Sequence, residues 1–419
     1  MSQSVANMPA GQTGSFSPSI PARSRGSDAA TPVHVVAIGG ILQFAHIVPV
    51  ACEIERRQPG SVTLFVLSPN DAAAAAAVIR ENGLAMPAIT VMTIPLALRP
   101  LAKAGLGKIL ALATWSGHLA RARVLLCAER TSTILRRLRP DCPPIVHIPH
   151  GAGDRAVGFE PRFKLFDQVL VAGNKDRDRL IASGLVAPED CLVAGPIKLA
   201  AILERGIARP PLFDNARPTI LFNPHFSKKH SSLDSFGRQL AEAVRKDGRY
   251  NLVIAPHARM AKSWSKRRRL SWQALAEAGR IIVDLGSPRC NDMTYTLGAD
   301  LYIGDVSSQV YEFLIRPRPC LFVDAKGVDW QSSEDYAMWH FGEVVAPDCA
   351  PIAAIDRAFA QHGAYVAWQR QRMAYSIAGI TWAPDGTPLL EGTAPAARAA
   401  DAVMRWAALP KEEALRTAA

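Results

Sequence analysis

The feature that most constrains the fold of this chain is a repeated order of apolar run, turn, helix and apolar run. In the first half, an apolar run at residues 33–38 ends in Gly39-Gly40. A helical pattern covers residues 42–57, and a second apolar run follows at 61–67. This order is typical of parallel strands joined by crossover helices, so it predicts a doubly wound α/β sheet.

The same pattern continues along the chain. A helix is expected at residues 72–81 with Asp71 as its N-cap, because this stretch is rich in alanine. Short buried strands are expected at residues 144–148 and 168–171. A proline-rich break at residues 209–211 then separates this half from the next.

Beyond the break the pattern restarts, with helical stretches such as 236–246 and 309–315 between apolar runs. The strands expected here are 219–222, 251–255, 281–283, 300–303 and 320–323. Two successive α/β units joined by a hinge predict two Rossmann-like domains that face a cleft.

Length supports this division, because 419 residues are too many for one ordinary hydrophobic core. Residues 1–30 are rich in Ser, Pro, Gly and Ala, so we expect a disordered tail. The domains expected after it are an acceptor-side domain at 31–208, a nucleotide-donor domain at 212–350, and C-terminal helices at 351–419 that pack on or across them.

Composition excludes several classes of protein. No apolar stretch approaches the roughly 20 residues of a membrane span, and no secretory signal core is present. The seven scattered cysteines contain no CxxC pair, which argues against a disulfide scaffold or a structural zinc site. We therefore expect a cytoplasmic protein, and the formal charge of +11 favours anionic partners.

Polar residues gather directly after the expected strands, where ligands bind in open α/β sheets. His150-Gly151 follows the strand at 144–148, and His257 follows the strand at 251–255. His225 stands in the same position after the strand at 219–222. The sequence therefore predicts a site at the carboxyl ends of the strands.

The strongest of these clusters lies after the strand at 300–303. Ser307 and Ser308 are natural N-cap residues, and the start of the following helix suits a phosphate. Glu312 lies one helical turn further on, where its carboxylate can accept ribose hydroxyls. An ordinary capped helix without a ligand is the alternative interpretation.

These clusters, in this order, resemble the CDP-glycerol glycerophosphotransferase family, whose motifs read approximately HGxxxK, RxHP and DYSSxxFD. The residues that carry the resemblance are His150, Gly151, Arg155, Pro256, His257, Asp305, Ser307, Ser308 and Glu312. It spans roughly residues 145–324. Arg155 replaces the family's Lys, and Val306 replaces an aromatic residue. Ala255 and Ala258 stand where the second motif has its arginine and proline.

The resemblance implies a GT-B architecture, meaning two Rossmann-like domains around a cleft, and a nucleotide-activated donor. It also implies that His150 is the general base and that His257 belongs to the catalytic centre and holds phosphate. Gly151, Arg155, Asp305, Ser307, Ser308 and Glu312 then form the donor and phosphate site. A purely structural role for either histidine remains open.

A second resemblance lies near the N-terminus. Gly40, His46, Pro49 and Glu53 are similar to the glycine turn and GHxxP segment of many nucleotide-sugar glycosyltransferases, whose first domain binds the acceptor. Gly40 and His46 are therefore expected on the acceptor side. The sequence contains no DxD motif and no convincing metal-ligand spacing, so we expect neither a metal nor another cofactor.

Two basic stretches predict contact with an anionic surface. The run at residues 266–269 is followed closely by Trp272, and Arg99, Lys103 and Lys108 surround apolar residues. Either stretch can be a solvated face or can lie on an anionic membrane. The second alternative would place the protein peripherally on the inner face of the plasma membrane. No nucleic-acid-binding motif accompanies the charge, so we do not expect that partner.

Three functions are compatible with the sequence. The first is transfer of glycerol phosphate, or a related polyol phosphate, from a CDP-activated donor to a polymer or lipid-linked acceptor in teichoic-acid-like or capsular synthesis. The second is a GT-B glycosyltransferase that uses a nucleotide sugar for capsule or lipopolysaccharide. The third is an inactive scaffold of the same fold that binds a polymer or a partner.

Overall fold

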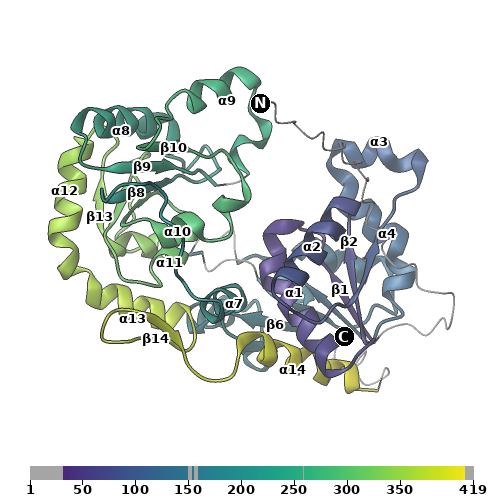
Figure 1. Cartoon of the computed structure of the whole chain (residues 1–419). Coiled ribbons are helices and arrows are strands. Elements are labelled where there is room, and N and C mark those ends of the chain that lie inside the picture. Colours follow the sequence, from purple (N-terminus) through teal and green to yellow (C-terminus); the bar gives the residue numbers. More distant parts are fainter. Residues whose placement is uncertain (1–31, 150–152, 155–158, 258, 411–419) are drawn as a thin grey trace, which may run out of the picture. The chain divides into compact units, whose positions relative to one another are not determined.

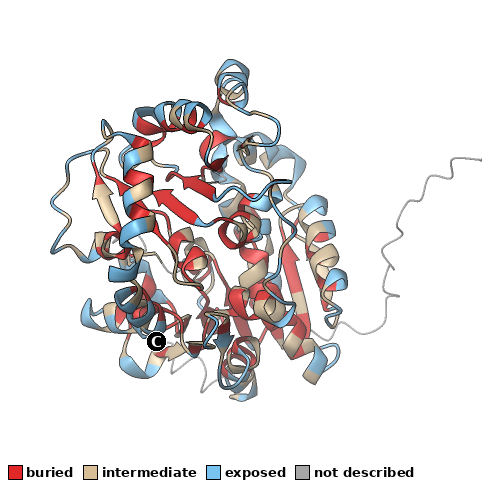
Figure 2. Ribbon diagram, turned by 60° about the vertical axis from the view of Figure 1, so that its left-hand side comes forward, coloured by how far each residue is buried: buried red, intermediate tan, exposed pale blue. Residues whose placement is uncertain are grey.

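The computed structural model describes residues 32–149, 153–154, 159–257 and 259–410. Two parallel sheets with helices on their faces form its framework, which confirms the predicted α/β class (Figure 1). The strands of both sheets are mostly buried, while the helices expose their outer sides (Figure 2). This distribution is expected because strands in a parallel sheet are covered on both faces.

The first sheet has seven parallel strands in the order β3-β2-β1-β4-β5-β6-β7. We call this sheet and the helices packed on it the first lobe. Its strands are β1 (Val33–Val36), β2 (Val62–Val66), β3 (Ala88–Val91), β4 (Val124–Cys127), β5 (Ile145–His147), β6 (Gln168–Val171) and β7 (Cys191–Val193). Its helices are α1 (Ile41–Arg57), α2 (Pro69–Glu81), α3 (Arg99–Leu101), α4 (Gly107–Leu119), α5 (Ile134–Leu138), α6 (Asn174–Ala182) and α7 (Ile197–Glu204).

The second sheet has six parallel strands in the order β10-β9-β8-β11-β12-β13, and with its helices it forms the second lobe. Its strands are β8 (Thr219–Asn223), β9 (Asn251–Ile254), β10 (Ile281–Val283), β11 (Leu301–Gly304), β12 (Cys320–Val323) and β13 (Glu343–Val345). Its helices are α8 (Leu233–Asp247), α9 (Lys266–Gln273), α10 (Thr294–Gly298), α11 (Gln309–Phe313), α12 (Pro351–Gln361) and α13 (Val366–Ser376). A small antiparallel hairpin, β14 (Ile380–Trp382) with β15 (Pro388–Leu390), follows.

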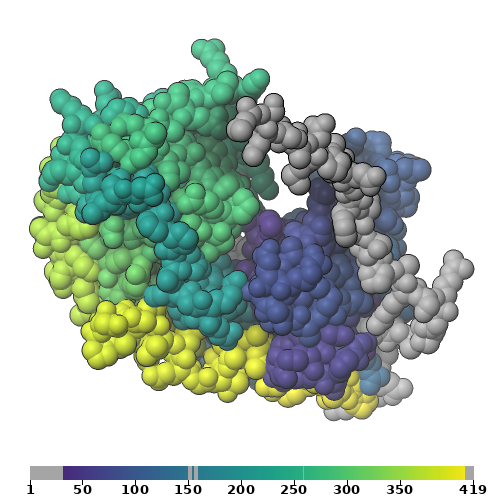
Figure 3. Space-filling view, in the orientation of Figure 1, coloured from purple at the N-terminus to yellow at the C-terminus, as the bar shows by residue number. Residues whose placement is uncertain are grey.

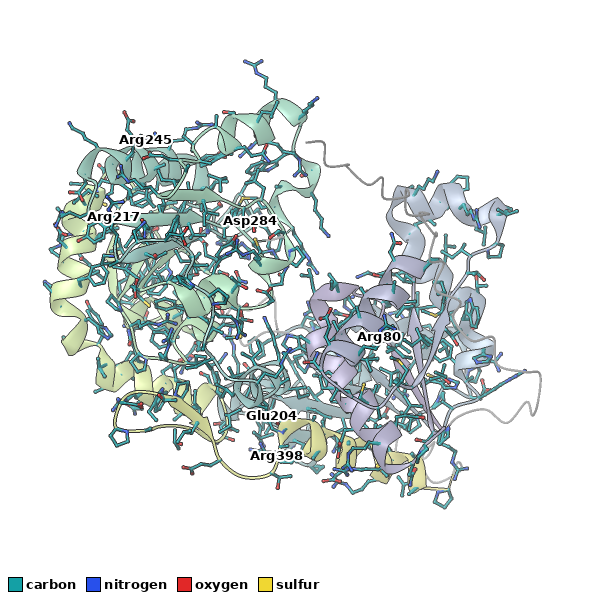
Figure 4. The ribbon with its side chains drawn as sticks, viewed as in Figure 1. Arg80, Glu204, Arg217, Arg245, Asp284 and Arg398 are labelled. Atoms are coloured by element: carbon teal, nitrogen blue, oxygen red, sulfur yellow. The ribbon has the colours of Figure 1, made fainter. Side chains whose placement is uncertain are left out.

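The last helix, α14 (Pro395–Ala408), belongs to the core of the first lobe although it follows the second lobe in sequence. Ala399 and Val403 are fully buried in that core. Arg57 of α1 forms an ion pair with Asp401, and Arg398 donates to the carbonyl oxygen of Ala194 at 2.9 Å (Figure 4). The chain therefore crosses back and ties its C-terminal part to its beginning.

The start of α2 corrects one sequence prediction. Its N-cap is Ser68, whose hydroxyl oxygen accepts a hydrogen bond from the amide of Asp71 at 3.1 Å. Asp71 lies inside the first turn and accepts from the Ser68 hydroxyl at 2.7 Å. Pro69 occupies the first helical position, where its missing N–H has no partner to lose.

Candidate functional site

The second sheet has its topological switch point between β8 and β11. The strand order runs outward in both directions from this pair, so the loops after β8 and β11 diverge and leave a crevice. Asp305, directly after β11, spans the crevice. Its carboxylate accepts hydrogen bonds from the amides of His225 at 2.8 Å and Ser232 at 2.9 Å.

Asp305 is buried, and donors of the chain itself occupy both of its oxygens. Burial raises the pKa of this carboxyl to about 6, although the surrounding amides favour its charged form. The indole of Trp339 also donates to its backbone oxygen at 2.8 Å. Asp305 therefore fixes the loop after β8 in place, and it has no oxygen left over for a ligand.

The two serines after Asp305 have different environments. Ser307 is buried, and its hydroxyl oxygen accepts a hydrogen bond from the amide of Gln309 at 3.4 Å. Ser308 is the N-cap residue of α11 by position, but its side chain makes no capping hydrogen bond. It is partly exposed and lines a cavity. Of the two hydroxyl groups, that of Ser308 is available to a ligand.

The first sheet has its own switch point, between β1 and β4. Gly40 lies in the turn after β1 with φ of 71°, a conformation that favours glycine. A side chain on Gly39 would collide with that of Gln43, which donates to the carbonyl oxygen of Ala128 after β4. These contacts fix the start of α1 and thereby place His46 two turns from the switch point.

One cavity joins the two groups of predicted residues. It has a volume of about 80 Å³ and is lined from the first lobe by His46, Ile148, Pro149 and the start of α7, and from the second lobe by Ser308, Tyr311 and Glu312. His46, Ser308 and Glu312 therefore line the same cavity. Gly40 and His257 are not among its lining residues.

Glu312 forms the charged wall of this cavity. One carboxylate oxygen lies 2.5 Å from the ammonium nitrogen of Lys198, which belongs to α7 of the first lobe. The other oxygen, Oε2, is buried and has no hydrogen-bond partner among the described residues. A buried carboxylate oxygen without a donor is unfavourable, so the hydrogen bonding of Glu312 is incomplete in this arrangement.

A buried cluster of charges lies beside the cavity. The hydroxyl of Tyr311 donates to both oxygens of Asp154 at 2.7 Å, and the ammonium group of Lys175 lies 3.1 Å from Asp154. Lys175 also donates to Asp176 at 2.8 Å. Burial alone would lower the pKa of Lys175, but the two carboxylates outweigh it and raise the pKa. The cluster joins the loop after β5 to α11 across the lobes.

His257 lies in a separate group of rings at the ends of β8 and β9. Its ring centre is 6.3 Å from that of His225 and 5.0 Å from that of Phe226, which is largely exposed. Its Nδ1 accepts a hydrogen bond from the amide of Arg259 at 3.2 Å. His257 thus lies beyond the same edge of the second sheet, outside the cavity.

Three predicted residues, His150, Gly151 and Arg155, lie outside the described residues. The chain on either side of His150 and Gly151 is described. Pro149 lines the cavity, and a side chain on Gly153 would lie 3.4 Å from the Cβ of Ser308. Within the described part of the chain, no group of three or more His, Cys, Asp or Glu residues is arranged to hold a metal ion.

Solved structures of the same fold include several enzymes. The wall teichoic acid polymerase TagF, in an H444N variant with CDPG, matches with a TM-score of 0.59 at 10% identity over 90% of this chain and 89% of that one. The fold is that of GT-B enzymes. UDP-GlcNAc 2-epimerase from Neisseria meningitidis bound to UDP-GlcNAc matches with a TM-score of 0.54 at 13% identity over 89% and 98% of the two chains.

A putative UDP-N-acetylglucosamine 2-epimerase from Listeria monocytogenes matches with a TM-score of 0.55 at 12% identity, over 90% of this chain and 95% of that one. No protein-family model and no curated protein sequence matches this chain. At these identities the likeness establishes the shared fold, which confirms the predicted GT-B architecture. The chemistry has to be argued from the site.

Sequence reasoning missed four residues that join the lobes beside the cavity: Lys198, Asp154, Lys175 and Tyr311. Tyr311 lies between two predicted residues, Ser308 and Glu312, so its position on α11 was a usable signal. The partners on the first lobe gave none, because Asp154 and Tyr311 are 157 positions apart in sequence.

Proposed function

We propose that this chain is a transferase that moves glycerol phosphate, or a related polyol phosphate, from a CDP-activated donor to an acceptor hydroxyl in the synthesis of a cell-surface polymer. The observation that supports this proposal most is the cavity in which His46 of the first lobe lies with Ser308 and Glu312 of the second. Donor-side and acceptor-side residues predicted from separate motifs share one site there.

The donor side of the proposed site is the wall formed by Ser308 and Glu312. The carboxylate of Glu312 is proposed to accept a hydrogen bond from a ribose hydroxyl, and the hydroxyl of Ser308 is proposed to donate to a phosphate oxygen. The cavity of about 80 Å³ is smaller than the roughly 300–1,000 Å³ of typical ligand pockets. It therefore takes only part of the donor, and the remainder extends past it.

In the proposed reaction the acceptor hydroxyl attacks the phosphorus that carries glycerol, and CMP leaves. His150 takes the proton of the hydroxyl, since an imidazole with a pKa of about 6.5 can accept a proton near neutral pH. This assignment rests on the family resemblance and on the position of Pro149, directly before His150, in the cavity wall. Arg155 and His257 are proposed to neutralise the departing phosphates.

The alternative is a glycosyltransferase in which the hydroxyl attacks the anomeric carbon of a nucleotide sugar and a nucleoside diphosphate leaves. It is kept because structures bound to UDP-GlcNAc and to UDP share this fold at TM-scores of 0.54 and 0.55. An inactive scaffold is the third candidate. The released nucleotide distinguishes the three candidates. The glycerophosphotransferase releases CMP, the glycosyltransferase releases a nucleoside diphosphate, and the inactive scaffold releases no nucleotide.

The deciding experiment incubates the full chain with CDP-glycerol, CDP-ribitol and UDP-sugars, and measures thermal stability and the nucleotide released. A donor at a hundred times its Kd stabilises a protein by about 2.7 kcal/mol, which a thermal shift detects. Release of CMP supports the proposal. Release of UDP supports the glycosyltransferase. If the chain binds no donor and releases no nucleotide, both enzyme proposals are contradicted.

Two variants test the site itself. His150→Ala should lower kcat about 10²–10⁴-fold, as expected for loss of a general base. Glu312→Gln should raise KM for the donor, because it weakens the acceptor offered to ribose. Glu204→Gln is the matched control, since Glu204 is an exposed carboxylate at the end of α7 and outside the cavity (Figure 4). Equal effects of Glu312→Gln and Glu204→Gln would contradict the assignment.

A further inference from the structure

The segment 93–109, which runs from the end of β3 into the first turn of α4, exposes an unusual number of large apolar side chains. Leu96 is 73% exposed, Leu101 48%, Leu106 43% and Ile109 39%. Of the thirteen large apolar residues that are exposed in the described chain, these four lie within fourteen consecutive positions. Single exposed leucines are normal on a protein surface, but several on one short segment suit an interaction site.

The backbone of this segment holds the leucines outward. It consists of a 3₁₀ turn at Leu96–Leu98, the short helix α3, and a π-helical turn at Ala102–Leu106 that leads into α4. Gly105 has φ of 101° and kinks the chain there. None of the residues in these three turns is buried, so the segment lies on the surface of the first lobe and contributes no side chain of these turns to its core (Figures 1 and 3).

The charge of the segment is of one sign. Residues 82–128 contain no Asp or Glu but five Lys and Arg residues. Arg99 and Lys103, which alternate with the leucines, are exposed and form no ion pair with any described residue. Lys108 is different, because it pairs with Glu129 at 2.8 Å. A surface that combines apolar side chains with unneutralised cations fits an anionic partner with an apolar interior.

The second basic stretch, on α9, offers less of this combination, because Leu270 is its one exposed large apolar residue. Arg268 forms an ion pair with Asp234 at 2.8 Å and stacks on Trp264, and Arg269 donates to the carbonyl oxygen of Ala261. Trp272 is buried in the core of the second lobe. The aromatic residues that could anchor α9 in a lipid interface are therefore already used in packing.

We propose that the segment 93–109 docks on the surface of an anionic lipid bilayer. Leu96, Leu101 and Leu106 enter the boundary between headgroups and acyl chains, while Arg99 and Lys103 lie at the lipid phosphates. The segment does not cross the bilayer, and no described helix is long and apolar enough to do so. This inference goes beyond the proposed function and does not depend on it.

The test is flotation of the full chain with two kinds of vesicle, phosphatidylcholine alone and phosphatidylcholine with phosphatidylglycerol. We expect flotation with the anionic vesicles and loss of it at high salt. Replacing Arg99→Glu and Lys103→Glu together should weaken binding at least about 30-fold, the equivalent of about 1 kcal/mol for each of two cations. Leu96→Gln with Leu101→Gln should weaken it at least about tenfold.

The matched control is the pair Lys266→Glu and Arg267→Glu, two exposed residues of α9, which changes the net charge equally. It should leave flotation nearly unchanged. Equal loss with this control would mean that net charge, rather than the segment, carries the binding, and would overturn the proposal. Absence of flotation overturns it too, as does a dimer in solution that Leu96→Gln with Leu101→Gln dissociates, because a second copy then covers the leucines.

Discussion

The hydrogen bond between Tyr311 and Asp154 should be a main link between the two lobes. Tyr311→Phe removes only the hydroxyl, which donates to both carboxylate oxygens at 2.7 Å, and leaves the ring in place. Both residues are buried, and burial raises the pKa of Tyr311, so its hydroxyl keeps the proton that it donates.

A hydrogen bond to a charged group contributes about 1.5–3 kcal/mol to stability. In the variant Asp154 keeps its contact with Lys175, so its charge stays partly compensated. We therefore expect Tyr311→Phe to lower the free energy of unfolding by about 2 kcal/mol. Urea unfolding, followed by tryptophan fluorescence and circular dichroism, measures this difference.

The matched control is Tyr302→Phe. Tyr302 is equally buried, but its hydroxyl donates to the neutral side chain of Asn223 at 3.2 Å, within the second lobe. Its loss should lower stability by about 1 kcal/mol. A double-mutant cycle of Tyr311→Phe with Asp154→Asn should give a coupling energy of about 1 kcal/mol or more. Additive effects, or equal losses for the two tyrosines, would refute the reasoning.

Four further variants are tested by urea unfolding. Burial and the nearby His118 lower the pKa of His34 from 6.5 to about 4, so the unfolded chain binds a proton first and stability falls between these pH values. His34→Phe should remove about 3 kcal/mol of this acid sensitivity, seen by comparing pH 7 with pH 4. Asp305→Ala should lower stability by about 4 kcal/mol because it leaves buried amides unpaired, whereas Ser308→Ala should change it by less than about 0.5 kcal/mol. Arg318→Met should lower the urea midpoint, because this buried guanidinium donates to carbonyl oxygens of α10 and α11.

The central strands of both sheets could be predicted because each is a short apolar run between turns. Several bounds agree within one residue, as in β6, β12 and the edge strand β10. The edge strands β3, β7 and β13 were missed, and each of them is short and only partly buried. The buried strand β4 does have such a run and was overlooked among basic residues.

The position of α14 could not be predicted from the sequence. Its apolar stripe indicates that the helix packs on a core, but a stripe does not say which of two cores receives it. In the same way, the motifs located the cavity residues Ser308 and Glu312, while the distant partner Lys198 left no local signal.

The site residues that could be predicted also separate into two physical roles. Asp305 accepts amide hydrogen bonds from the loop after β8, so a chain with this switch point needs an acceptor at its position. Its presence is therefore explained by the fold, and it says little about the donor. Ser308, Glu312 and Lys198 line the cavity instead, and Glu312 is the one of these three whose side chain has a buried oxygen without a partner among the described residues. Among the described residues that line the cavity, substitutions that change donor choice should therefore act at these three positions, while substitutions at Asp305 should act through stability alone.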